Sequence, residues 1–212
     1  IKDQLLAGRL LSISIGLVQA WVMTLLAKQL KMSKRFQLLT ALLSAILPYW
    51  YFHQHLALMD GMLTLWLSCS SLFVLKIIEE KNQAQFISKN SILAGVFFGL
   101  AILTKIPAFL FAPSLLLLLL LKQNLNLNQA KSLLQKIAFS FFIAGLIFLS
   151  LKLHPAFGQL FSRGSDFLFS WQEVLLEGKW RETVPSWPTY FQYFGVYLTW
   201  PIFLSVSYTH LR

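Results

Sequence analysis

The sequence is poor in charge: only 12% of its 212 residues are Asp, Glu, Lys or Arg. A soluble domain carries about a quarter charged residues, and a disordered segment needs low hydrophobicity with high net charge. Both classes are excluded, because 57% of the residues are hydrophobic and the mean hydropathy is +0.63. The composition therefore predicts an integral membrane protein.

Several chemical motifs are also missing. The single cysteine, Cys69, lies in the apolar run 63–75, which excludes a disulfide framework or a cysteine-based metal site and predicts inert packing in a helix. The sequence has no glycine-rich phosphate loop, no Ser/His/Asp order and no HExxH zinc motif. It starts at Ile1 without a basic segment and cleavage site, so we expect no signal peptide and treat the chain as a fragment. Residues 207–212 (SYTHLR) resemble translated adapter sequence, and we assign them no function.

What is present is a series of apolar runs. Spanning a bilayer takes roughly 20 apolar residues of helix, so the runs predict an all-α, polytopic membrane helical bundle with about seven transmembrane helices. Pro107 starts helices better than it continues them, so the run 92–121 is predicted as two short helices joined by a turn at Lys105. One long tilted helix is the alternative. The predicted helices of this partial transmembrane domain (1–206) cover residues 5–27, 38–52, 61–78, 92–103, 107–121, 137–153 and 190–205.

The basic residues orient these helices. The chain has a net charge of +10, and ten of its 18 Lys and Arg residues lie in three loops, 28–35, 76–90 and 122–136, which seven helices in series place on one side. The positive-inside tendency makes that side cytoplasmic, so the charge indicates no nucleic-acid partner. The turn 53–60, the Lys105 turn and a long loop, 154–189, then face outward.

The long outer loop has helical periodicity. It predicts an extracytoplasmic amphipathic helix lying on the outer membrane surface, with a solvated loop helix as the alternative. The apolar face carries Leu160, Gly164, Leu168, Trp171 and Leu175, and the polar face carries Arg163, Asp166, Ser170, Glu173 and Glu177.

A few polar residues near the outward helix ends are candidate site residues, because charge in a bilayer is costly. Asp60 is either a helix N-cap or a site carboxylate that serves as metal ligand, acceptor orienter or base. Arg9 either snorkels to the headgroups or clamps a phosphate, and Lys105 would suit a lipid phosphate. His53 and His55 form part of a metal site with Asp60 or are interfacial polar residues.

Two stretches resemble a known family. Residues 49–66 (YWYFHQHLALMDGMLTLW) and 93–105 (LAGVFFGLAILTK) are similar to the membrane core of the GT-C glycosyltransferases. The stretches resemble bacterial members of this group that are akin to protein O-mannosyltransferases and the lipid A aminoarabinose transferase. The shared features are an Arg near the start of the family's second helix (Arg9), an Asp opening a helix (Asp60) and a GLAxLTK helix end (99–105). Gly61 departs from the proline that often follows the Asp.

The resemblance implies an enzyme that transfers a sugar, with inversion, from a polyprenyl-phosphate donor to a lipid, protein or glycan acceptor. Transfer would occur on the extracytoplasmic face of a bacterial plasma membrane, among membrane lipids. Arg9 and Lys105 would contact the donor phosphate, Asp60 would line the acceptor or metal side, and His53 and His55 would line the cavity. No cofactor is certain, and a divalent metal stays open. The family's principal catalytic acid would precede Ile1, so we expect this piece alone to be inactive.

Two other classes remain as alternatives. A transporter or flippase of lipid-linked or small solutes would show related halves and polar groups at mid-membrane. We find no internal repeat, and the charges lie at the ends of the apolar runs. A non-catalytic subunit of a membrane assembly would depend on none of the charged residues. The sequence therefore favours the glycosyltransferase.

Overall fold

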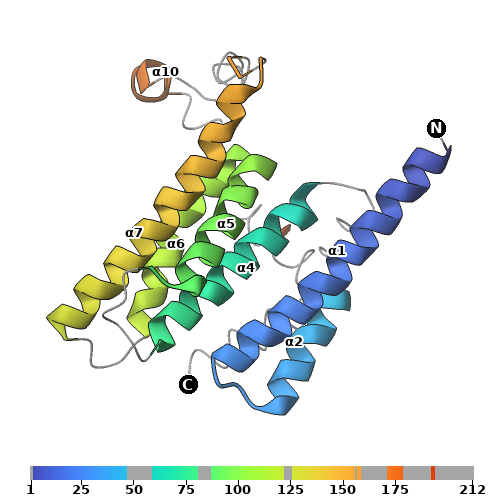
Figure 1. The fold of residues 1–212 in the computed structure, drawn as a ribbon. Helices are drawn as coiled ribbons and strands as arrows, with labels where there is room; N and C mark the ends of the chain where they lie inside the picture. Colours follow the sequence, from blue (N-terminus) through green and yellow to red (C-terminus); the bar gives the residue numbers. More distant parts are fainter. Residues whose placement is uncertain are drawn as a thin grey trace. The chain divides into compact units, whose positions relative to one another are not determined.

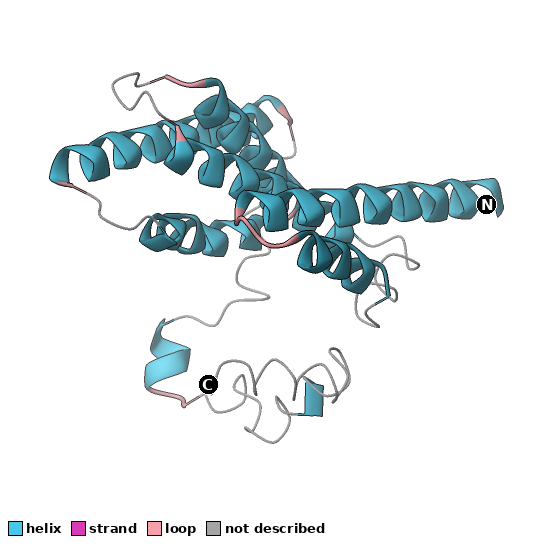
Figure 2. Cartoon of the chain, turned by 90° about the horizontal axis from the view of Figure 1, so that it is seen from below, coloured by secondary structure: helices cyan, strands magenta, loops and turns pink. Residues whose placement is uncertain are grey.

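The computed structural model of the chain describes residues 2–46, 59–80, 87–121, 126–155, 157–158, 171–178 and 192–193. Its regular structure is helical, and Figure 2 draws helices and loops but no strand in this described part. The predicted all-α class is therefore confirmed for these residues. The helices, labelled as in Figure 1, are α1 (Lys2–Gln29), α2 (Lys34–Ile46), α4 (Met59–Glu79), α5 (Lys89–Thr104), η1 (Ile106–Phe111), α6 (Ala112–Leu117), η2 (Leu118–Leu121), α7 (Leu127–Leu149), η3 (Ser150–Leu153) and α10 (Trp171–Leu175).

Three helical segments are long and apolar enough to cross a membrane: Leu6–Gln29, Met59–Glu79 and Leu127–Leu153. Large apolar side chains cover their outer surfaces; Leu17, for example, is 69% exposed. Contact between such a surface and lipid carries no hydrophobic penalty, whereas exposing the same surface to water would be unfavourable. The structure and composition thus indicate an integral membrane protein, while the count of seven spans stays a prediction.

The chain divides into two units, and the first contains the helices that matter here. It comprises Ile1–Ile46 with Trp50–Leu149. Within it α2 packs on α1, α1 on α4, α4 on α5 and α5 on α7, so that these helices form a row (Figure 1). The C-terminal ends of α1 and α4 and the starts of α5 and α7 lie at one end of the row. We call this the basic end, because it carries the described lysines of the three basic loops, among them Lys28, Lys76 and Lys89.

The break between α5 and η1 is the predicted turn at Lys105. Lys105 has an extended backbone (φ −153°, ψ 129°), and its N–H closes the last turn of α5 by bonding to the carbonyl of Ala101 at 3.0 Å. Pro107 has no N–H to continue the helix and instead stands in the first turn of η1. The prediction of two short helices is confirmed, and a single long helix is wrong.

Close packing between α5 and α7 depends on two glycines one helical turn apart. A Cβ atom at Gly95 would collide with the carbonyl oxygen of Ser140, and one at Gly99 would lie 2.9 Å from the side chain of Ile147. The hydroxyl of Ser140 donates to the carbonyl oxygen of Ser91 at 2.9 Å across the same interface. Small residues that bring backbones together are the usual basis of helix association in lipid.

The α1–α4 interface contains a polar contact among apolar side chains. The Gln19 amide donates to the Ser68 hydroxyl at 2.9 Å, and the Gln19 side chain is buried. Its Oε1 atom has no hydrogen-bond partner among the described residues. Cys69 is a buried free thiol that packs with Val22 and Leu65, as its predicted inert role requires.

Some predicted boundaries need correction. The helix predicted at 137–153 begins ten residues earlier, at Leu127 of α7, so Lys131 and Lys136 are helical residues and not loop residues. The second predicted helix, 38–52, begins at Lys34, and residues 47–52 lie outside the described part. The sequence analysis started both helices after a basic cluster, but lysine and arginine are good helix formers and need not lie outside a helix.

The second unit comprises Leu47–Tyr49 with Ser150–Arg212. Its described helices are η3 and α10. The helix α10 falls within the predicted amphipathic segment, and the rest of that segment lies outside the described residues. The helix predicted at 190–205 lies outside them too, apart from residues 192–193.

Candidate functional site

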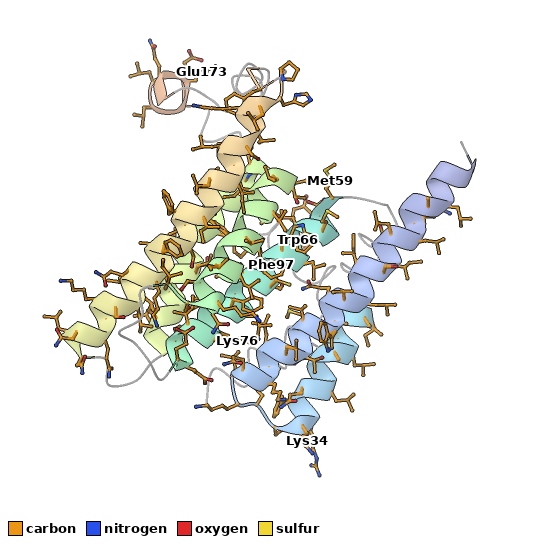
Figure 3. All side chains as sticks on the ribbon, in the orientation of Figure 1. Lys34, Met59, Trp66, Lys76, Phe97 and Glu173 are labelled. Atoms are coloured by element: carbon orange, nitrogen blue, oxygen red, sulfur yellow. The ribbon has the colours of Figure 1, made fainter. Side chains whose placement is uncertain are left out.

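The end of the row opposite the basic end brings together Asp60 and Lys105. Asp60 lies in the first turn of α4, and Lys105 lies directly after α5. Because α4 and α5 run antiparallel, the start of one helix meets the end of the other. Met59, labelled in Figure 3, marks this end of α4, and Lys76 marks the basic end.

These two residues form an ion pair. Lys105 Nζ donates to Asp60 Oδ1 at 2.5 Å, and the two side chains are 40% and 32% exposed, respectively. A carboxylate in the first turn of a helix is also stabilised by the helix dipole. The ammonium group has three donor hydrogens, so a ligand oxygen can bind it while Asp60 stays bound. The pair is therefore held by protein and still open to a ligand.

Arg9 does not join this pair. Ile15, six residues further along α1, lies level with Gly61, where a Cβ atom would be 3.8 Å from its side chain. At about 1.5 Å per residue, Arg9 lies about 9 Å further along the axis of α1. Its side chain is exposed and makes no ion pair within the described residues. The structure thus brings together two of the three predicted charged residues.

The predicted histidines are not tested by the structure. His53 and His55 lie outside the described residues. Within the described residues, no group of three or more His, Cys, Asp or Glu side chains is placed to hold a metal ion. A metal site that includes the two histidines and Asp60 therefore stays a prediction.

Sequence analysis missed a second ion pair, which lies at the basic end. Lys136 Nζ of α7 donates to Glu80 Oε2 at 2.6 Å, and the Lys136 side chain is fully buried. Asn90 donates to the other carboxylate oxygen, Oε1, at 2.8 Å. Burial raises the pKa of the Glu80 carboxyl, but hydrogen bonds from Lys136, Asn90 and Ser88 outweigh this and hold the pKa below its usual value. The available signal was the pair of acidic residues, Glu79 and Glu80, inside a loop otherwise rich in lysine.

The fold and this site define a class: a helical membrane protein with a half-exposed lysine–carboxylate pair at one end of its helix row. The sequence matches the family described as dolichyl-phosphate-mannose-protein mannosyltransferase over residues 2–159. The chain belongs to this family, whose members are membrane glycosyltransferases that use a polyprenyl-phosphate sugar donor and an acceptor. Comparisons with curated proteins and with solved structures gave no match.

Proposed function

We propose that this chain is part of an inverting glycosyltransferase that moves a sugar from a polyprenyl-phosphate donor to a lipid, protein or glycan acceptor. The reaction takes place on the extracytoplasmic face of a bacterial plasma membrane. The observation that carries the proposal is the Lys105–Asp60 pair, at the end of the helix row opposite the basic end. The positive-inside tendency assigns the basic end to the cytoplasm and hence the pair to the outer face.

Lys105 is proposed to stabilise the leaving group. In the reaction, the acceptor hydroxyl oxygen bonds to the anomeric carbon, and the bond from that carbon to the phosphate oxygen breaks. Negative charge then builds on the departing polyprenyl phosphate, and a fixed ammonium donor stabilises such charge in the transition state. The acceptor proton passes to a general base, which we expect outside the described residues.

Asp60 is proposed to have two roles. It lines the acceptor or metal side of the cavity, and it positions Lys105. Its carboxylate fixes the position of the Lys105 ammonium through the ion pair. A half-exposed lysine would otherwise sample many rotamers, and ordering it at the moment of reaction costs entropy. Arg9 would contact the same phosphate from α1 only if the donor bridges the gap between them.

The experiment measures sugar transfer from labelled polyprenyl-phosphate mannose by the complete gene product. Lys105→Ala is expected to lower kcat about 100-fold, the usual effect of removing one transition-state donor. Lys131→Ala is the matched control, because Lys131 is an exposed lysine of α7 near the basic end. The control should keep wild-type transfer; a wild-type rate for Lys105→Ala would refute the assignment.

A double variant separates the two roles of Asp60. If Asp60 acts through Lys105, then Asp60→Asn combined with Lys105→Ala should transfer sugar no more slowly than Lys105→Ala alone. If Asp60 acts separately, on the acceptor or a metal, the two losses should multiply. If the wild type and the variants all bind labelled donor but none of them transfers sugar, a transporter would be favoured instead.

A further inference from the structure

A cavity of about 280 Å³ opens between the ends of α1 and α4 at the basic end. Its charged lining comprises Lys28 in the last turn of α1, Lys31 just after that helix, and Lys76 and Glu79 in the last turn of α4. Leu25 and the buried Leu72 supply apolar wall. The cavity thus combines a net positive charge with a hydrocarbon surface, and it lies far from the Lys105–Asp60 pair.

Two of the three lysines have no carboxylate partner in the described residues. The one acidic residue of the cavity, Glu79, accepts a hydrogen bond from Gln29 at 2.7 Å and pairs with Lys31 at 3.5 Å. Lys76 Nζ lies 4.6 Å from the centre of the Phe73 ring, a cation–π contact that positions the ammonium without neutralising it. Lys28 and Lys76 therefore remain available to an anion.

Lys31 occupies a backbone position that favours glycine. Its φ is 59°, in the left-handed region, and it stands just beyond the last turn of α1. Lys31 N–H bonds to the carbonyl of Lys28 at 2.9 Å and Met32 N–H to that of Ala27 at 3.0 Å, the two bonds of a Schellman motif. A lysine here is strained relative to glycine, so an observed lysine points to a use for its side chain.

We propose that this cavity binds the phosphate of an anionic phospholipid in the leaflet at the basic end. Both α1 and α4 are membrane-spanning by length, and their ends bring Lys28, Lys31 and Lys76 to headgroup level. Basic pockets between transmembrane helices bind such headgroups. The lysines also offset the negative ends of two helix dipoles, but that role requires neither a cavity nor a strained Lys31. The leucines favour a lipid over free phosphate.

The experiment titrates phosphatidylglycerol into the purified, intact protein in neutral detergent and follows binding by native mass spectrometry. Phosphatidylcholine is the comparison lipid, because its phosphate is balanced by a cation. Lys28→Ala with Lys76→Ala is expected to weaken phosphatidylglycerol binding about 25-fold, since each lysine contributes about fivefold at such a surface. Lys89→Ala with Lys131→Ala removes the same charge from exposed sites outside the cavity and should change the Kd less than about threefold.

The proposal is overturned if both double variants weaken binding equally, because the attraction would then belong to the whole basic surface. It is overturned too if phosphatidylcholine binds as tightly, or if inorganic phosphate at equal concentration displaces the lipid and marks a site for a soluble anion. Lys31→Gly guards against misfolding as the cause. It should keep or raise the unfolding temperature and still weaken phosphatidylglycerol binding about fivefold. Unchanged binding by Lys31→Gly would also overturn the proposal, because the strained Lys31 would then have no part in holding the lipid.

Discussion

Two lysine–carboxylate pairs at opposite ends of the row, Lys136–Glu80 and Lys105–Asp60, differ in burial. Lys136 is fully buried, and its partner Glu80 is 18% exposed and also accepts a hydrogen bond from Asn90. Lys105 and Asp60 are 40% and 32% exposed. A buried charge is costly to leave unpaired, whereas an exposed pair contributes little to stability. We infer that the first pair fixes the helices and that the second is available to a ligand.

Glu80→Gln is expected to produce the largest loss of stability. Removing one charge of a buried pair costs about 3–5 kcal/mol, because the Lys136 ammonium would stay buried without a partner charge. The free energy of unfolding in mixed micelles measures it. Adding Lys136→Met to Glu80→Gln should recover part of the loss, since an apolar side chain of similar length needs no partner. A double variant less stable than the single one would contradict this explanation.

Gly95→Ala should cost less, about 1–3 kcal/mol, because the added methyl group collides with the backbone of α7 near Ser140 and forces the helices apart. Gly145→Ala in α7 is the control, since a Cβ atom there meets nothing within 4 Å. The control should leave stability equal or improve it, as alanine is the better helix former. Equal losses would show that α5 and α7 do not pack so closely. Thermal unfolding monitored by circular dichroism distinguishes the cases.

Acid should remove the contribution of the Glu80 carboxylate to the free energy of unfolding. Its pKa is lower in the folded protein than its ordinary value of 4.5, so its contribution is fully present above pH 4.5 and is lost as the pH falls through the lowered value. The stability difference between the wild type and Glu80→Gln should therefore narrow in acid. Unfolding measured at several pH values tests this, and a difference that widens in acid would contradict the direction of the shift.

Asp60→Asn should have the smallest effect on stability, about 0–1 kcal/mol, because its pair with Lys105 is half-exposed. Unfolding under the same conditions as for Glu80→Gln gives the comparison. A loss as large as that of Glu80→Gln would make the two pairs equivalent and remove the distinction drawn above.

Much of the first unit could be predicted from the sequence, because apolar runs and a proline determine where membrane helices start and break. Asp60, Lys105 and the turn between α5 and η1 were found in this way, and their contact follows from two antiparallel helices. The Glu80–Lys136 pair was missed, because Lys136 has the same appearance in sequence as a loop lysine. Its burial depends on which face of α7 meets α4 and α5, and tertiary packing sets that face.

The most direct test makes the same substitution at both lysines, Lys105→Met and Lys136→Met, and measures sugar transfer per folded molecule together with the free energy of unfolding. We expect Lys105→Met to lower transfer about 100-fold and to change stability by less than about 1 kcal/mol. Lys136→Met should cost about 3–5 kcal/mol and leave transfer per folded molecule near the wild-type rate. Wild-type transfer by Lys105→Met, or an equal loss of transfer in both variants, would contradict the assignment of function to the exposed pair.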